Sequence, residues 1–208
     1  MALQIAQDPD ADRLLNESSF ALLVGMLLDQ QYPMEHAFRG PWKIASRISS
    51  FDPQTVAGYD PAEFEEICAT PPAIHRYGRS MARRVQELAR VIVDEYDGQP
   101  EKVWEESDGA ADLLKRLHAL PGYGEQKARI FAALLGKQLG FRPYGWRKTI
   151  GPYAEERSTR SVADVVDPAS LQRVRDFKKA QKAEKAGKAT GPAQADEPGG
   201  TAKAAGRK

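Results

Sequence analysis

The chain has 208 residues, of which 41% are hydrophobic, so it has the length and apolar content of one folded domain with a packed core. Its 30 Lys and Arg residues nearly balance its 29 Asp and Glu residues, and the net charge of +1 excludes a uniformly basic, histone-like protein. The single cysteine, Cys68, excludes an intrachain disulfide, a four-cysteine iron–sulfur cluster and a cysteine-based zinc site. The histidines are His36, His75 and His118, and they are too far apart in the sequence to show a metal-ligand spacing. We therefore expect no cofactor.

The chain contains no segment of membrane-spanning length. Its longest strongly apolar run covers residues 20–28, whereas a transmembrane helix needs about 20 such residues. The first residues, MALQIAQDPDADR, lack the basic start and apolar stretch of a signal peptide. We therefore expect a cytoplasmic protein without a membrane anchor.

Helical patterns dominate the chain. Capping residues at 16–19 precede the apolar run over 20–28, which predicts a buried helix. Asp-Pro pairs at 52–53 and 60–61 are typical helix starts. From 77 to 96 the apolar residues recur in steps of three and four, which is a helical period. No stretch alternates like a strand, so we predict an all-α fold of about eight to ten helices.

Residues 177–208 differ from the rest in composition. They carry eight Lys and Arg against three Asp and Glu, and no aromatic residue follows Phe177. Such a segment buries too little apolar surface to offset the entropy lost on ordering. We expect a helical domain over 1–176 and a disordered basic tail over 177–208, entered through a helix that extends to about residue 186. The tail is either a solubilising extension or a mobile arm that contacts nucleic-acid phosphates.

The most informative stretch is residues 117–140, LHALPGYGEQKARIFAALLGKQLG. Pro121 and Gly122 end one helix, and Gly124 precedes the next. Two glycines separated by one residue permit a tight turn and leave room for another backbone to approach. The free amides and positive dipole end of the second helix suit a phosphate. We favour a DNA contact by Gly122, Gly124 and their neighbours over an ordinary hairpin within a helical bundle.

LPGYGEQKA resembles the helix-hairpin-helix signature of the endonuclease III and 3-methyladenine glycosylase II (HhH-GPD) superfamily of base-excision DNA glycosylases. FALLVGMLLDQQ is similar to that family's buried helix ending in a glutamine, with Gln31 at the matching place. RYGRSMARRVQELARVIVDEYDGQP is similar to the helix that leads to the hairpin. Together these segments cover roughly residues 18–150 in the expected order.

The resemblance implies a two-lobed helical fold, with double-stranded DNA across the cleft and a target base turned into a pocket between the lobes. Gln31 would correspond to a residue near the opened base pair. Tyr123 sits at the hairpin tip, where it either only packs or touches the minor groove of the DNA. The carbonyls of His118, Leu120 and Tyr123 would correspond to those that often hold a monovalent cation between hairpin and phosphate. We expect a monomer without an iron–sulfur cluster.

The lysine of the hairpin departs from the family pattern. Members that also cut the strand carry a lysine two residues beyond the second glycine, where this chain has Gln126. The lysine follows as Lys127, and one residue turns a side chain by about 100° around a helix. We therefore expect Gln126 and Lys127 to face DNA or solvent, and we expect no Schiff-base lyase activity.

The family's catalytic aspartate is also missing. In relatives it lies in a loop after the second hairpin helix, where it stabilises charge on the sugar or activates water. That place falls near Tyr144, which is uncharged at neutral pH. No acid occurs between Glu125 and Glu155. Six cations in this stretch instead suit the DNA backbone, among them Arg147 and Lys148; the others are Lys127, Arg129, Lys137 and Arg142.

Asp29, at the end of the buried apolar helix, is the first candidate for a replacement acid. A carboxylate there is costly without partners or a function, and a structural cap or salt bridge is the alternative role. Trp146 and Tyr144 are candidates for a base pocket, because aromatic rings stack on extruded bases. For Trp146 a core position is the alternative.

The sequence thus predicts a monofunctional DNA glycosylase that cleaves the N-glycosidic bond of a damaged base. Alkylated purines are placed slightly ahead of other lesions, because an already cationic base leaves readily. The missing aspartate leaves open a non-catalytic DNA-binding protein of the same fold, and the fold could also serve a protein partner. A position of Asp29 facing the cleft before the hairpin would favour the enzyme.

Overall fold

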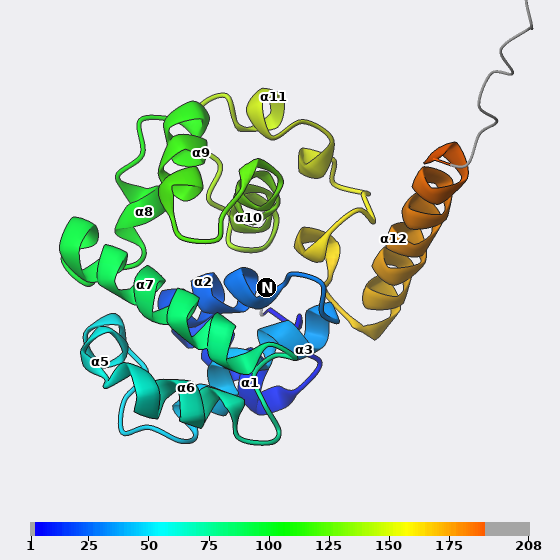
Figure 1. Cartoon of the computed structure of the whole chain (residues 1–208). Coiled ribbons are helices and arrows are strands. Elements are labelled where there is room, and N and C mark those ends of the chain that lie inside the picture. The colour runs from blue at the N-terminus through cyan, green and yellow to red at the C-terminus, as the bar shows by residue number, and fades with distance from the viewer. Residues whose placement is uncertain (1–2, 190–208) are drawn as a thin grey trace, which may run out of the picture.

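The computed structural model describes residues 3–189 of the chain, and side chains for residues 3–184. This part of the protein is all-α, as predicted, with twelve α-helices, two short 3₁₀ helices and no strand. None of the helices described is long and apolar enough to cross a membrane. Figure 1 shows the helices in two groups, which we call the N-terminal and C-terminal lobes.

The N-terminal lobe comprises the first seven helices, shown in blue to green in the lower part of Figure 1. Two Asp-Pro pairs begin helices here as predicted, because each aspartate accepts a hydrogen bond from an amide in the first turn. Asp52 accepts from the amide of Thr55 at 2.8 Å, and Asp60 from that of Glu63 at 2.9 Å. The helices are α1 (Pro9–Glu17), α2 (Ser19–Leu28), α3 (Met34–Phe38), α4 (Gly40–Ala45), α5 (Pro53–Gly58), α6 (Pro61–Ala69) and α7 (Gly78–Tyr96).

Helix α2 is the centre of this lobe. Ser18 caps it by accepting a hydrogen bond from the amide of Ala21 at 3.1 Å, and every residue from Phe20 to Leu28 is buried. Helices α1, α3, α4 and α7 all pack against it. Because four helices surround α2, close packing in the core of the lobe fixes the position of the last turn of α2.

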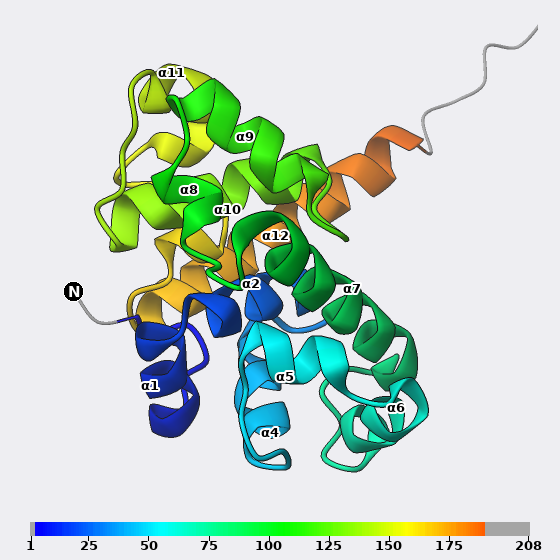
Figure 2. The same ribbon diagram turned by 90° about the vertical axis from the view of Figure 1, so that its left-hand side faces the viewer.

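The C-terminal lobe holds the predicted hairpin, formed by α9 and α10. These helices pack against each other, and α10 also contacts α11 and both 3₁₀ helices. Figure 2 shows this lobe above the N-terminal lobe, with α8, α9 and α11 on its outer side. Its elements are α8 (Lys102–Glu105), α9 (Ala110–Ala119), α10 (Glu125–Gln138), α11 (Trp146–Ile150), η1 (Gly151–Ala154) and η2 (Val162–Asp164).

Helix α12 (Pro168–Ala189) follows the two lobes and packs on η2. It stands beside the junction between the lobes, at the right of Figure 1. The predicted boundary between residues 176 and 177 falls inside this helix, so residues 177–189 continue it. The rest of the predicted disordered tail, residues 190–208, lies outside the described part of the chain.

Candidate active site

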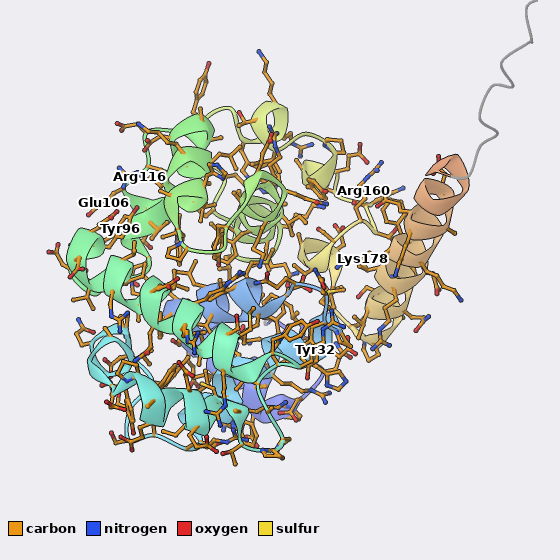
Figure 3. The ribbon with its side chains drawn as sticks, in the orientation of Figure 1. Tyr32, Tyr96, Glu106, Arg116, Arg160 and Lys178 are labelled. Atoms are coloured by element: carbon orange, nitrogen blue, oxygen red, sulfur yellow. The ribbon has the colours of Figure 1, made fainter. Side chains whose placement is uncertain are left out.

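A cleft of about 730 Å³ opens between the two lobes and α12. Figure 3 labels Tyr32, Arg160 and Lys178 around it, on the side of the molecule opposite to Tyr96, Glu106 and Arg116. The cleft is built from the end of α2, the first turn of α10, η1 and the middle of α12. Its lining residues are Met26, Asp29, Gln31, Tyr32, Gly124, Glu125, Gln126, Lys127, Ile130, Pro152, Tyr153, Arg160, Phe177, Lys178 and Gln181.

The hairpin turn has the geometry that its two glycines predict. Gly122 has φ +78°, and a Cβ atom there would lie 2.4 Å from Cδ1 of Leu27, so only glycine fits. Gly124 is exposed, and a Cβ atom there would meet nothing within 4 Å. The two positions therefore differ: Gly122 is required by packing against α2, whereas Gly124 faces open space.

The first turn of α10 presents its amides beside that open space. Residue Gly124 precedes the helix without a side-chain cap, and the first amide to bond within the helix is that of Ala128, which donates to Gly124 O at 3.0 Å. The amides of residues 125–127 thus remain available, as at any uncapped helix N-terminus. Together with the positive end of the helix dipole, they form a surface suited to a phosphate.

Tyr123 lies at the hairpin tip, but its side chain does not face outward. The ring is 2% exposed, and its hydroxyl donates a hydrogen bond of 2.8 Å to the carbonyl of Leu23 in α2. Burial raises the pKa of this phenol well above its ordinary value. The Tyr123 side chain therefore joins the hairpin to the N-terminal lobe, and its amide and carbonyl also have partners within the hairpin, Leu120 O and His118 Nδ1.

Asp29 faces the cleft. It is the C-cap residue of α2, and its side chain is 12% exposed. The Nζ atom of Lys178, on α12, lies 3.9 Å from its Oδ2. The end of a core helix thus places a carboxylate in the cleft beside the hairpin. In the family pattern the acid instead comes from the loop after the hairpin.

Lys127 lines the cleft, and its predicted contact with DNA stays a prediction. Its Nζ atom donates a hydrogen bond of 2.7 Å to the carbonyl of Leu27 and lies 5.9 Å from the centre of the Tyr123 ring. Burial lowers the pKa of Lys127 to about 8; Arg84 lowers it further, and Asp29 opposes the shift. Helix α10 thus turns this side chain toward α2, which its position in the sequence alone does not reveal.

Gln31 lies on the rim of the cleft in a constrained turn. Its φ of +52° is in the left-handed region, which non-glycine residues seldom adopt. Nε2 of the buried His75 lies 3.1 Å from the carbonyl of Gln30, and Arg76 donates a hydrogen bond to Oε1 of Gln31 at 2.9 Å. Because His75 Nδ1 accepts from the amide of Tyr77, the Nε2 atom carries the proton in a neutral ring. Burial also lowers the pKa of His75.

Neither aromatic residue predicted for the base pocket lines the cleft. Trp146 is 3% exposed and lies in the core of the C-terminal lobe, where its indole N–H donates to the carbonyl of Ala132 at 2.9 Å. Tyr144 is 96% exposed, on the loop before α11. The sequence left a core position open as the alternative role of Trp146, and the structure shows Trp146 in the core.

Three other aromatic residues line the cleft: Tyr32, Tyr153 and Phe177. Gln126 also lines it and donates a hydrogen bond of 2.9 Å to the hydroxyl of Tyr153. The sequence analysis missed all three rings. For Phe177 one signal was present, because an isolated aromatic residue at the start of a basic segment usually has a packing partner.

The run of cations after the hairpin is less free than its sequence suggests. Acids from outside the run neutralise several of its members: Lys137 forms a buried ion pair with Asp164, and Arg147 bonds to Glu156 at 2.7 Å. Arg129 bonds to Glu125 at 3.1 Å. Exposed pairs of this kind are weak, so Arg147 can exchange its partner, and Lys148 is exposed beside it.

The predicted cation site at the hairpin turn is formed by carbonyls that also have protein partners. The carbonyl of Leu120 accepts a hydrogen bond from the amide of Tyr123 at 3.1 Å, and Nδ1 of His118 lies 3.1 Å from the carbonyl of Tyr123. A carbonyl oxygen has two lone pairs, so one such bond leaves room for a cation, and the monovalent cation stays a prediction. Within the described part of the chain, no three or more His, Cys, Asp or Glu side chains are grouped to hold a metal.

The chain belongs to the HhH-GPD superfamily of base excision DNA repair proteins. The model of that family matches residues 24–192, which include the last turn of α2, the hairpin and α12. The predicted family is thereby confirmed, and the match extends beyond the segments whose resemblance was visible in the sequence. No curated protein sequence matches the chain.

Two solved structures are similar to this one. One is H. pylori 3-methyladenine DNA glycosylase (MagIII) bound to 1,N6-ethenoadenine, with 13% identity, a TM-score of 0.42, and coverage of 88% of this chain and 94% of that chain. The other is a trapped endonuclease III–DNA covalent intermediate, with 16% identity, a TM-score of 0.40, and coverage of 80% and 79%. Values of this size carry no conclusion about the chemistry of this chain.

Proposed function

We propose that the protein is a DNA glycosylase that acts as a monomer on double-stranded DNA and cleaves the N-glycosidic bond of a damaged base. The observation that carries this proposal is the position of Asp29, a largely buried carboxylate lining the cleft beside the hairpin. Membership in the base excision repair superfamily supports DNA as the substrate. A cleft of about 730 Å³ has room for an extruded nucleotide.

The hairpin supplies the DNA contact in this proposal. A phosphate of the damaged strand lies against the first-turn amides of α10, where Gly124 leaves open space. Such contacts fix the position of the strand without reading base identity. Gln31 stands on the rim of the cleft, where the gap left by an extruded base would form.

Asp29 carries the chemistry. As the base departs, positive charge develops on the sugar, and a fixed carboxylate stabilises that charge or accepts a proton from the attacking water. The Asp29 side chain is largely shielded from solvent, so its field is only partly screened. The rings of Tyr32, Tyr153 and Phe177 provide apolar walls against which a base can stack.

We expect the enzyme to be monofunctional. Gln126 stands where strand-cutting members of the family carry their lysine, and the Nζ atom of the neighbouring Lys127 is bonded to the carbonyl of Leu27. Borohydride reduction during turnover therefore yields no covalent protein–DNA complex. A trapped complex that is lost in Lys127→Met would show that Lys127 is a nucleophile and that the enzyme is bifunctional.

The test of the proposal is release of free base from a panel of lesion-containing duplexes under single-turnover conditions. Wild-type protein releases a base from at least one lesion, and Asp29→Asn slows the release by about 10² to 10⁴, the usual contribution of such a group. Asp10→Asn, on the exposed face of α1, is the matched control and leaves the rate unchanged.

The absence of an acid between Glu125 and Glu155 favours the second candidate, a DNA-binding protein of this fold without catalysis. Folded wild-type protein that binds lesion duplexes but releases no base from any of them would support this candidate and contradict the glycosylase. Equal rates for wild type and Asp29→Asn would contradict the role of Asp29 alone.

A further inference from the structure

Cations outnumber acids in the cleft. Three basic side chains from three different segments line it: Lys127 on α10, Arg160 before η2 and Lys178 on α12. The acids that line it are Asp29 and Glu125. The net charge inside the cleft therefore depends on how strongly the charge of each of these two acids acts there.

Asp29 is shared between two lysines. The Nζ atom of Lys178 lies 3.9 Å from its Oδ2, and the Nζ atom of Lys127 bonds to the carbonyl of Leu27, two residues before Asp29, in the same cleft. Two ammonium groups thus face one carboxylate, and this trio carries a net charge of +1. Arg84, on α7, adds a further positive charge that acts on Lys127.

The remaining acid does little to reverse this balance. The Glu125 side chain is 78% exposed and bonds to Arg129 at 3.1 Å, so water and a partner both weaken its field inside the cleft. Arg160 has an exposed partner, Glu155, at 3.7 Å, and its guanidinium lies over the Phe177 ring, 5.5 Å from its centre. The interior of the cleft is consequently positive.

The charge of the departing base decides how such a cleft acts on it. In hydrolysis the electron pair of the C1′–N bond moves to the base, and water adds to C1′ and gives up one proton. That proton ends on the base when the base departs as an anion, and on Asp29 or solvent when the base departs neutral. An alkylated purine begins cationic and becomes neutral as the pair arrives. A neutral base such as uracil instead develops negative charge until it gains the proton. Fixed positive charge opposes binding of the first and stabilises the departure of the second.

We infer, on the basis of the glycosylase function proposed above, that the substrate is a neutral base that departs as an anion, such as uracil or an oxidised pyrimidine. This replaces the alkylated purine that the sequence analysis placed slightly ahead. The observation that carries the inference is the pair of lysines, Lys127 and Lys178, around the single interior carboxylate.

Lys127 is the group that meets the departing base. Only one of its three N–H donors is used in the described structure, by the carbonyl of Leu27. The others are free to bond to a base oxygen or nitrogen as negative charge develops there. Its depressed pKa also makes it a better proton donor to the leaving base than an ordinary lysine.

A phosphate is the other anion that these cations could bind, and the two roles have different kinetic signatures. A cation that contacts only phosphate changes the affinity for every duplex alike. A cation that stabilises the departing base changes the single-turnover rate at saturating protein, and does so more for an anionic than for a neutral leaving group.

The experiment compares single-turnover release of uracil and of 7-methylguanine from otherwise identical duplexes. Wild-type protein releases uracil at least about tenfold faster, and Lys127→Met lowers the uracil rate by about a hundredfold or more, the effect of losing one fixed charge donor. Lys127→Arg keeps the charge and retains most of the rate. Lys178→Met lowers the ratio of uracil to 7-methylguanine release. Lys102→Met, on α8 away from the cleft, is the control.

The outcomes separate this inference from the proposed function. Faster release of 7-methylguanine, or equal loss of both rates in Lys127→Met, would overturn the anionic leaving group while the glycosylase stands. Weaker binding of all duplexes with unchanged saturating rates would assign the lysines to phosphate and overturn it also. No release of either base or of any other lesion would contradict the glycosylase itself, and the inference with it.

Discussion

The hydroxyl of Tyr123 donates a hydrogen bond of 2.8 Å to the carbonyl of Leu23, one hundred residues earlier in the chain. Four residues further along each segment, Lys127 donates to the carbonyl of Leu27. These two bonds hold the hairpin against α2, and they fix the distance between the hairpin turn and the acid at the end of α2. The two sides of the cleft are therefore aligned by buried contacts.

Removal of the first of these bonds should destabilise the protein. Tyr123→Phe keeps the ring but leaves the buried carbonyl of Leu23 without this donor, which costs about 1 to 3 kcal/mol. The measurement is the free energy of unfolding from urea denaturation, compared between wild type and variant when both have the same m-value. Tyr144→Phe removes the same atom from a side chain that is 96% exposed and should have no effect. An unchanged stability in Tyr123→Phe would contradict the importance of the bond.

The two hairpin glycines should respond differently to substitution. Gly122→Ala forces a Cβ atom to within 2.4 Å of Leu27 at a φ of +78°, and should destabilise the fold by about 1 to 3 kcal/mol. Gly124→Leu meets open space and should leave stability within about 0.5 kcal/mol.

The same Gly124→Leu variant should weaken duplex binding by about tenfold, or about 1.4 kcal/mol, because its side chain occupies the approach of the phosphate. Binding is measured by fluorescence anisotropy at fixed salt. Wild-type affinity in this stable variant would show that the DNA backbone does not approach the turn.

Substitutions of Trp146 and Tyr144 should have different effects on stability. Trp146→Ala removes a buried indole and its bond to Ala132, and should cost about 3 to 5 kcal/mol of unfolding free energy. Tyr144→Ala should leave both stability and base release unchanged, because this side chain lies outside the cleft. Slower base release by Tyr144→Ala would show that the residue reaches the substrate after all.

Lys127 should give the protein a specific pH dependence. Its pKa of about 8 in the folded state lies below the ordinary value of 10.5, so between these pH values the unfolded state binds more protons. Stability contributed by this residue therefore rises with pH across that window. At pH 7 both states hold the proton, and the cost of burying the charge, about 3 kcal/mol, is present in full.

The difference in unfolding free energy between wild type and Lys127→Met measures the pH-dependent contribution of Lys127 to stability. The wild type should gain about 3 kcal/mol on the variant between pH 7.5 and 10.5, because the variant lacks the titrating group. A difference that stays constant over this range would show that Lys127 titrates normally in the folded protein.

Much of the fold was predictable because local signals agree with it. The Asp-Pro starts, the apolar period over residues 77–96 and the two hairpin glycines each specify local structure, and α5, α6, α7 and the hairpin begin or end where these signals stand. Short helices such as α3, α4 and α8 were not predicted, because four to six residues show no period. The total of helices was underestimated for that reason.

The cleft was only partly predictable. Asp29 was found because a carboxylate at the end of an apolar helix needs an explanation. The direction of Lys127 and the core position of Trp146 depend on packing between segments distant in sequence, which no local pattern records. Phe177 and Lys178 were assigned to a tail because α12 is rich in Lys and Ala, and its contact with the cleft depends on where η2 anchors it.

The helix that bears Asp29 is enclosed by four others, and this has a consequence for how the protein can change. An acid on a surface loop can be shifted by insertions or by loop motion, but this one moves only if the interior is repacked. Under the proposed function, substitutions deep in the N-terminal half would then alter turnover as well as folding. Selection on activity and selection on thermodynamic stability would act on the same apolar side chains.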